Sequence, residues 1–320
     1  MKRLYVSIML LMVFVLSSCN QALRVTNCVP LFVMDTIVNI TFYNESEADV
    51  HYNKIKEIYQ LYDELADDFS SSSKYENIYS LNSKRKVTAT PELIELVEEA
   101  VNLEKETNGY FNPMIGRISH IWKDAITTDT SYPSAELITS ELNIMNNTSV
   151  SINGNEIELI GDANIDLGAM AKGYATEKVR EYLKENNISG YLISAGESSV
   201  LLGKKGNDDF KIGLSKPFNS EYIKVVECSN ISIGTSSYKY QKKEFDEGLA
   251  HHLINPFTGY PSNYYTSVNV MCESSTLCDV YSTAIFSMDI DTAKAFAANK
   301  NIDVLLFGNN EVLYQSDNFW

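Results

Sequence analysis

Residues 149–160 read Ser-Val-Ser-Ile-Asn-Gly-Asn-Glu-Ile-Glu-Leu-Ile, and this stretch decides the fold class. Apolar and polar residues alternate on both sides of Asn153-Gly154, a pair that favours the tight turn of an antiparallel hairpin. A helical pattern follows, opening with residues 166–173 and running through Asn186. Hairpins mixed with helices predict an α+β fold of largely antiparallel sheets with packed helices, rather than a regular βαβ alternation.

The flanking sequence extends this prediction in both directions. Apolar residues at helical spacing predict a helix over residues 48–66. Thr90-Pro91-Glu92 is typical of a helix start, because it combines a capping hydroxyl, a first-turn proline and an acid near the positive end of the dipole, and Gly109 would end that helix. Further helices are expected at 275–288 and 291–300, and strands at 29–43, 191–194, 200–202, 210–214, 222–228, 266–272, 304–307 and 312–314.

Composition excludes several classes of protein. The chain has 320 residues, 44% of them hydrophobic, which is enough for a packed core. Its 42 acidic residues outnumber its 26 basic ones, giving a net charge of −16, and this acidity argues against a nucleic-acid partner. Length alone allows two domains or one large one. Because the motifs described below lie at both ends and in the middle of the chain, we expect a single domain.

The N-terminus has the layout of a secretory signal. Lys2 and Arg3 precede an almost wholly apolar stretch at 4–16, too short to span a membrane, and then Leu16-Ser17-Ser18-Cys19 follows. This ending resembles the lipobox of bacterial lipoproteins. The resemblance implies a signal peptide at 1–18, a lipid on Cys19 and a lipidated tether at 19–28, on the outer side of a bacterial cell membrane, which leaves residues 29–320 for the folded domain. The alternative is an ordinary signal peptide with an incidental cysteine.

Four cysteines follow Cys19 in the sequence. They form no CxxC pair and no zinc-binding spacing. Export would permit disulfides, but so few cysteines in so long a chain favour small buried hydrophobic residues. The sequence leaves their disulfide status open; they are Cys28, Cys228, Cys272 and Cys278.

Residues 166–173, Asp-Leu-Gly-Ala-Met-Ala-Lys-Gly, could hold a phosphate. Their small side chains allow a ligand close to the backbone, and the start of a helix presents free N–H groups to an anion. Lys172 adds a positive charge. The alternative is a helix start that packs closely against a neighbouring element.

Two further segments carry candidate chemistry. His251 and His252 are adjacent before a Pro/Gly-rich turn; on an extended segment they point to opposite faces, so only one needs to face a cleft. That histidine could transfer a proton, or it could be an ordinary surface histidine. Asp279 and Thr283 share one helix face and offer the hard oxygen ligands that Mg²⁺ takes, although a surface charge is the plainer interpretation.

Taken together, these segments resemble the FAD:protein FMN transferase family, the ApbE flavin-transfer lipoproteins, over nearly the whole mature chain. The similarity lies in five motifs: Met34-Asp35-Thr36, residues 108–113 (Asn-Gly-Tyr-Phe-Asn-Pro), residues 166–173, residues 252–261 (His-Leu-Ile-Asn-Pro-Phe-Thr-Gly-Tyr-Pro) and Asp279-x-x-x-Thr283. The resemblance implies a transferase that binds FAD and Mg²⁺, moves FMN to a Thr or Ser hydroxyl of an electron-transfer protein and releases AMP.

The resemblance also assigns roles to individual residues. FAD would contact Met34, Ser72, Tyr110, Phe111, Asn112, Asp166, Lys172 and Ile254. The metal would be held by the Ala169 carbonyl and by Asp279 and Thr283, which makes Asp279 a catalytic residue, and His252 is the candidate for proton transfer.

This chain departs from the family at several positions. Asn112 and Asn255 replace acids, Gly196-Glu197 replaces a glycine pair, and Ser72 lies where the family has an aromatic flavin contact. Stacking on the flavin would then come from another side chain, for which Tyr75 is one candidate. The polar run at 69–74 that contains Ser72 is expected to be a functional loop rather than a flexible linker.

Two other functions fit the same motifs. The first is an FAD pyrophosphatase, in which water replaces the acceptor hydroxyl and FAD is cleaved to FMN and AMP. The second is a non-catalytic lipoprotein that binds flavin without turnover and without a metal.

Overall fold

The computed structural model describes residues 23–128, 131–317 and 319 and confirms an α+β fold of antiparallel sheets with packed helices. The expected signal peptide and Cys19 lie outside the described residues. Within the described ranges, none of the helices has the length and apolar character needed to cross a membrane.

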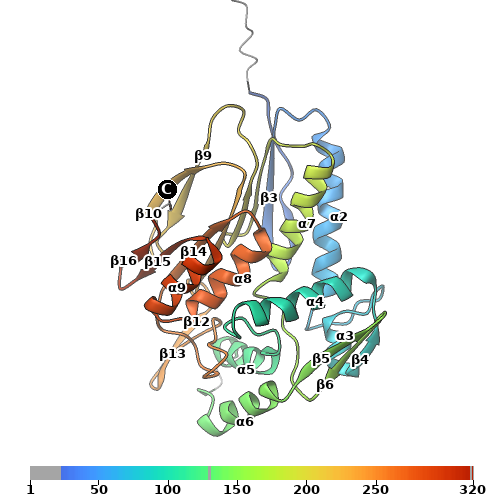
Figure 1. Cartoon of the computed structure of the whole chain (residues 1–320), viewed down its shortest axis with the longest axis vertical. Coiled ribbons are helices and arrows are strands. Elements are labelled where there is room, and N and C mark those ends of the chain that lie inside the picture. Colours follow the sequence, from blue (N-terminus) through green and yellow to red (C-terminus); the bar gives the residue numbers. More distant parts are fainter. Residues whose placement is uncertain (1–22, 129–130, 318, 320) are drawn as a thin grey trace, which may run out of the picture.

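A nine-stranded sheet forms the centre of the molecule (Figure 1). Its order is β1-β3-β7-β8-β11-β14-β15-β16, with β2 paired to β3 beside this path. All of these pairs are antiparallel. The strands are β1 (Val25–Asn27), β2 (Leu31–Val33), β3 (Thr36–Tyr43), β7 (Tyr191–Ala195), β8 (Ser199–Leu202), β11 (Ile231–Ser237), β14 (Ser267–Cys272), β15 (Asp303–Gly308) and β16 (Glu311–Gln315).

Three smaller sheets complete the β structure of the described residues: β9 (Phe210–Ser215) with β10 (Tyr222–Cys228), β12 (Lys242–Phe245) with β13 (Gly248–His251), and β4 (Lys86–Thr88) with the hairpin β5 (Ser149–Asn153) and β6 (Glu156–Ile160). The predicted hairpin is present, but its turn is one residue further along. Asn153 pairs with Glu156, so the loop is Gly154-Asn155, and Gly154 takes the positive φ of +60° that glycine accepts without strain.

Helices pack on the central sheet and at one end of it. Helices α7 and α8 contact the sheet, and α2 runs beside α7 (Figure 1). The predicted helix at 48–66 is confirmed residue for residue as α2. The helices are α2 (Ala48–Ala66), α3 (Ile78–Lys84), α4 (Pro91–Glu106), α5 (Gly116–Thr127), α6 (Ala135–Asn146), α7 (Ala171–Glu185), α8 (Ser275–Phe286) and α9 (Ile290–Lys300).

The ordered fold begins earlier than the expected boundary at residue 29. Val25 pairs with Tyr43 across β1 and β3, and the Cys28 N–H donates to the Ile40 carbonyl oxygen at 2.9 Å. The last residues of the predicted tether are therefore part of the sheet. Most buried side chains from Leu31 to Leu306 form one hydrophobic cluster, which agrees with a single domain, and a second, smaller cluster includes Phe210, Val226 and Leu305.

Candidate functional site

The site forms where the first turn of α7 meets α8. Gly173 makes this contact possible, because a Cβ atom there would lie 2.5 Å from the Ser275 carbonyl oxygen and 2.8 Å from Cβ of Asp279. Gly173 thus serves close helix packing, and phosphate binding by residues 166–173 stays a prediction. The same packing buries Asp279 beside the positively charged Lys172.

Replacing Gly173 with alanine is expected to destabilise the protein by about 1–3 kcal/mol, because the methyl group collides with backbone and with Asp279 rather than with a movable side-chain end. Urea unfolding followed by circular dichroism measures the change. Gly154→Ala is the control for a glycine with open space around it, although its positive φ also costs some stability. A Gly173→Ala protein as stable as the wild type would contradict the close contact.

Asp279 has an unusual environment for a carboxylate. The residue is 7% exposed, and its Oδ1 atom has no hydrogen-bond partner among the described residues. Burial raises its pKa to about 7, opposed by the charge of Lys172 and by hydrogen bonds from the Gly173 backbone and the Ser199 side chain. A buried oxygen without a partner is costly unless a ligand satisfies it, so Asp279 is suited to a bound cation.

The donor set around Asp279 suits a hard cation that keeps its own water ligands. Thr283, one turn further along α8, places its hydroxyl 3.1 Å from the Ser236 hydroxyl of β11. Ala169 lies in the turn just before α7. The described part of the chain contains no cluster of three or more His, Cys, Asp or Glu side chains that could hold a metal. One carboxylate, one hydroxyl and one carbonyl nevertheless fit Mg²⁺, which needs few protein ligands.

Asp166 anchors the loop before α7. Its Oδ2 accepts a hydrogen bond from Ser119 Oγ at 2.5 Å, and its Oδ1 accepts one from the Gly168 N–H at 2.7 Å. These bonds hold the loop in a fixed shape. Asp166 is thus mainly occupied within the protein, so its expected contact with FAD remains a prediction.

The two adjacent histidines point to opposite sides, as predicted. His251 is fully buried, stacks on Tyr238 at 4.4 Å, donates from Nε2 to the Ser262 carbonyl oxygen and accepts at Nδ1 from the Leu253 N–H. His252 is exposed. Desolvation by the protein around its ring nevertheless lowers its pKa, and the charge of Lys172 lowers it further. His252 is therefore neutral at pH 7, near the charged groups of the site, and able to accept a proton.

The segments at 108–113 and 252–261 meet through their aromatic side chains. The rings of Tyr110 and Phe257 pack edge to face, with centroids 4.9 Å apart. Phe111 and Ile254 are buried, at 3% and 7% exposure, so their side chains support the core rather than offer a broad surface to a flavin. Asn112 uses its Oδ1 to accept from the Met114 N–H at 2.9 Å.

Met34 and Ser72 lie on two turns. Met34 and the next residue both have a positive φ, near 55°, which is strained for residues with side chains, and the Met34 N–H donates to Asp63 Oδ1 at 3.0 Å. Ser72 donates to Glu64 and accepts from the N–H groups of Lys74 and Tyr75, so its hydroxyl shapes the loop at 69–74.

A second group of polar and aromatic residues was not predicted from the sequence. His120 Nε2 donates to Asp68 Oδ2 at 2.6 Å, and the His120 ring stacks on Phe69 at 4.7 Å. Both histidine and acid line a cavity of about 440 Å³. Asp166 acts electrostatically on this pair, which places the cavity beside the site. The helical spacing of α5 could have flagged His120, but its partner is 52 residues away in the sequence.

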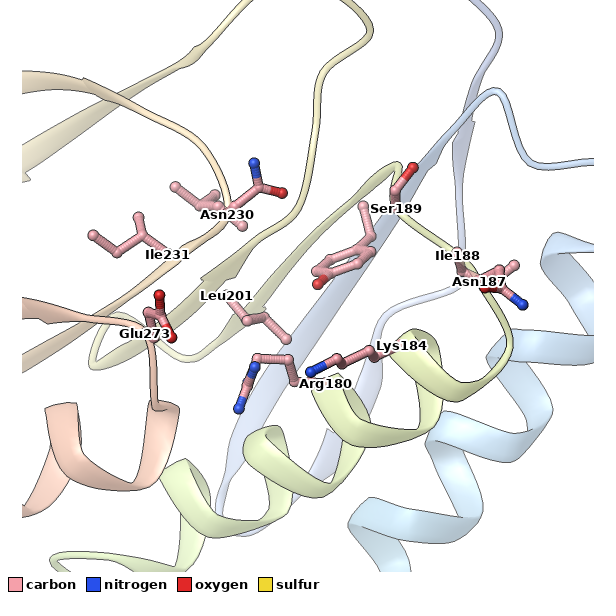
Figure 2. Close-up of a pocket in the computed structure, with 11 residues that line it drawn as sticks. Arg180, Lys184, Asn187, Ile188, Ser189, Leu201, Asn230, Ile231 and Glu273 are labelled. Atoms are coloured by element: carbon pink, nitrogen blue, oxygen red, sulfur yellow. The ribbon is translucent and has the colours of Figure 1, made fainter.

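Another cavity of about 440 Å³ lies away from these residues, at the C-terminal end of α7 (Figure 2). Arg180 and Lys184 point into it from α7, and Glu273 lines it from the junction between β14 and α8. None of the site residues predicted from the sequence lines this cavity.

Comparison with known proteins shows the family of this chain. The model of the ApbE family matches residues 34–306, which is most of the chain and includes every segment of the site. This chain belongs to the ApbE family. Related ApbE structures share its fold: a protein from Thermotoga maritima has a TM-score of 0.83 at 22% identity, covering 92% of this chain and 98% of the other. The flavin transferase ApbE from Vibrio cholerae has a TM-score of 0.74 at 20% identity, covering 93% and 98%.

Curated relatives of this ApbE chain are similar along most of their length. A FAD:protein FMN transferase of Klebsiella pneumoniae is 24% identical over 285 residues, 87% of this chain and 88% of the relative. One of Vibrio cholerae is 25% identical over 288 residues, 85% and 84% of the two chains.

Proposed function

We propose that this chain is a Mg²⁺-dependent FAD:protein FMN transferase, which moves FMN from FAD to a Thr or Ser hydroxyl of an extracytoplasmic electron-transfer protein and releases AMP. The observation that carries the proposal is the buried Asp279, one oxygen of which has no partner in the described part of the chain, beside Lys172 and the start of α7. The names of the curated relatives support the reaction class.

The reaction breaks the phosphoanhydride bond of FAD and forms a phosphate ester with the acceptor hydroxyl. The acceptor hydroxyl attacks the phosphorus on the FMN side of the FAD pyrophosphate, the bond to AMP breaks, and the hydroxyl proton must leave. Phosphoryl transfer depends on positioning and on charge neutralisation more than on covalent help from the protein. When bound, Mg²⁺ supplies part of that neutralisation.

The residues of this chain supply the rest. Asp279, Thr283 and the Ala169 carbonyl would hold the cation. Lys172 and the free N–H groups at the start of α7 add positive potential for the pyrophosphate. This local charge matters because the acidic protein as a whole repels an anionic substrate. The neutral His252 would accept the hydroxyl proton.

We also propose the location of the enzyme. Cleavage before Cys19 and lipidation of that cysteine would anchor the protein outside the cytoplasm, through acyl chains rather than through a basic patch. Mass spectrometry of the protein from a membrane fraction tests this, since a lipidated N-terminal peptide beginning at Cys19 is expected and an unmodified cysteine would contradict it.

One experiment distinguishes the transferase from the FAD pyrophosphatase and from the non-catalytic flavin-binding lipoprotein. The protein is mixed with FAD and Mg²⁺, with and without an acceptor protein. A flavinylated acceptor supports the transferase, release of AMP and FMN without an acceptor supports the pyrophosphatase, and tight FAD binding without turnover or metal dependence supports a flavin-binding lipoprotein.

His252→Ala is expected to slow transfer by about 100-fold at neutral pH, because proton transfer by a placed side chain contributes on this scale. The pH profile should also change. The transfer rate of the wild type falls at low pH, where His252 becomes protonated, whereas the rate of the variant should not show this fall. His252→Gln is the control that keeps a polar side chain of similar size. Full transfer by His252→Ala across a pH series would remove His252 from the mechanism.

Mg²⁺ is expected to stabilise the protein more at pH 8 than at pH 6. The pKa of Asp279 rises from 3.8 in the unfolded chain to about 7 in the folded protein, so the metal-free folded state binds the extra proton, and its stability falls as pH rises between those values. A cation binds the ionised carboxylate, so its binding, and the stability that it adds, should increase as the pH rises past 7. Thermal unfolding with and without Mg²⁺ measures this, and Asp279→Asn should abolish the gain; an equal gain at both pH values would contradict the role of Asp279.

A further inference from the structure

Two cysteines lie in contact directly before the candidate metal ligand. Cys272 ends β14, Cys278 lies in the first turns of α8, and their Sγ atoms are 3.1 Å apart. A disulfide bond is about 2 Å long, so the two sulfur atoms need to approach by only about 1 Å to form one. Of the other two described cysteines, Cys228 is buried, as expected for a small hydrophobic residue, whereas Cys28 is partly exposed.

The surrounding structure holds both cysteines in place. Cys272 pairs with Ser232 of β11, and the thiol of Cys278 donates to the Ser232 carbonyl oxygen at 3.3 Å. The start of α8 is fixed as well, because the Ser275 N–H donates to Glu177 Oε2 at 2.8 Å and the Ser275 hydroxyl lies 2.8 Å from that of Ser232. Since strand and helix are both anchored to the same neighbour, the two sulfur atoms stay close.

Cys272 is the more exposed of the two cysteines. Cys278 is buried at 1% exposure, whereas Cys272 is partly exposed. Glu273, the residue after Cys272, is exposed and lines the cavity at the end of α7 (Figure 2). A small reagent therefore reaches Cys272 first and leaves Cys278 to react from within the protein.

We propose that Cys272 and Cys278 are a site of oxidation, and that a disulfide-containing reagent converts them to an intramolecular disulfide. The Cys272 sulfur attacks the reagent's disulfide, forms a mixed disulfide and releases one thiol. The Cys278 sulfur then attacks the sulfur of Cys272 and releases the second thiol. Two electrons and two protons pass from the cysteines to the reagent, which leaves as two thiols.

The disulfide would connect the end of β14 to the residue that precedes Asp279. It would therefore fix the start of α8, where the carboxylate lies, against the central sheet. Oxidising compartments outside the cytoplasm allow such a bond to persist. The proposal depends on the two sulfur atoms alone and stands whether or not the chain transfers FMN.

Peptide mapping tests the proposal on the folded, full-length protein. The protein is treated with oxidised glutathione, its free thiols are alkylated in denaturant, and it is cut with a glutamyl endopeptidase, which cleaves after Glu273 and so separates the two cysteines. We expect the two peptides to remain joined, at a mass lower than their sum by two hydrogen atoms, and to separate after reduction. Cys28 and Cys228 should both be alkylated.

Two variants make the result specific. Cys272→Ser should leave Cys278 alkylated and unlinked, while Cys28→Ser, which removes another partly exposed cysteine, should keep the linked peptides. Alkylation of both Cys272 and Cys278 in the treated wild type, or a lasting glutathione adduct on Cys272 without the link, would overturn the proposal.

Discussion

Asp279→Asn is expected to lower the rate of FMN transfer by about 100- to 1,000-fold, which is the scale of losing one group that stabilises charge in a transition state. The substitution keeps the size of the side chain and removes its charge. The carboxylate is buried, one of its oxygens has no partner among the described residues, and Lys172 lies close enough to act on it electrostatically. Asparagine cannot offer a cation the same negative charge.

The measurement is covalent flavin incorporation into an acceptor, followed by fluorescence at saturating FAD and Mg²⁺. Asp208→Asn, which changes an exposed aspartate in the connection between β8 and β9, is the matched control and should transfer at the wild-type rate. If Asp279→Asn also transferred FMN at the wild-type rate, Asp279 would not be a ligand of a required cation.

Trp122→Ala is expected to lower the free energy of unfolding by about 3–5 kcal/mol, as for other large-to-small changes in a core. Trp122 on α5 is completely buried, and its ring contacts those of Tyr132 and Tyr260. Its Nε1–H donates to the Gly259 carbonyl oxygen at 2.7 Å. This bond connects α5 to the turn that follows His252, so the variant should also weaken FAD binding.

Urea unfolding of the wild type, Trp122→Ala and Trp122→Phe distinguishes the contribution of ring packing from that of the Nε1–H hydrogen bond. Phenylalanine retains most of the packing and loses the hydrogen bond, so we expect a smaller loss, of about 1–3 kcal/mol. A loss below about 1 kcal/mol for Trp122→Ala would mean that Trp122 does not support the turn as its contacts indicate.

Local patterns were sufficient where a single element determines its own structure. The apolar stripe of α2 and the capping residues of α4 predicted both helix starts, and Thr90 caps α4 as expected by accepting from the Leu93 N–H. The alternation of strand residues also predicted that His251 and His252 diverge.

Sequence patterns did not predict the elements whose composition is determined by contact with another element. Strand β11 reads Ile-Ser-Ile-Gly-Thr-Ser-Ser, and most of its residues are small because α8 lies against it. A Cβ on Gly234 would come within 2.4 Å of the Cys278 backbone. Helix α5 was not predicted either, and its His120 contacts Asp68, 52 residues away in the sequence, only in the folded chain. Strand β1 was missed because its pairing with β3 is not encoded in its three residues.

The charged residues of the site were predicted more completely than the side chains that would contact the flavin. Lys172 acts on both Asp279 and His252, so residues from three separate motifs lie near one another in the structure. Phe111 and Ile254 are buried in the structure, and their contact with FAD stays a prediction, because sequence motifs report which residues recur together and do not report which side chains remain accessible.

The central claim is that this chain attaches FMN covalently to another protein and that Asp279 is required. The most direct measurement compares protein-bound flavin in the native organism after deletion of this chain and after its replacement by the wild type or by Asp279→Asn, with mass spectrometry of every fluorescent band. We predict FMN on a Thr or Ser of at least one extracytoplasmic protein with the wild type, and its absence after deletion and with Asp279→Asn. Identical flavin-modified proteins in all strains would contradict the account.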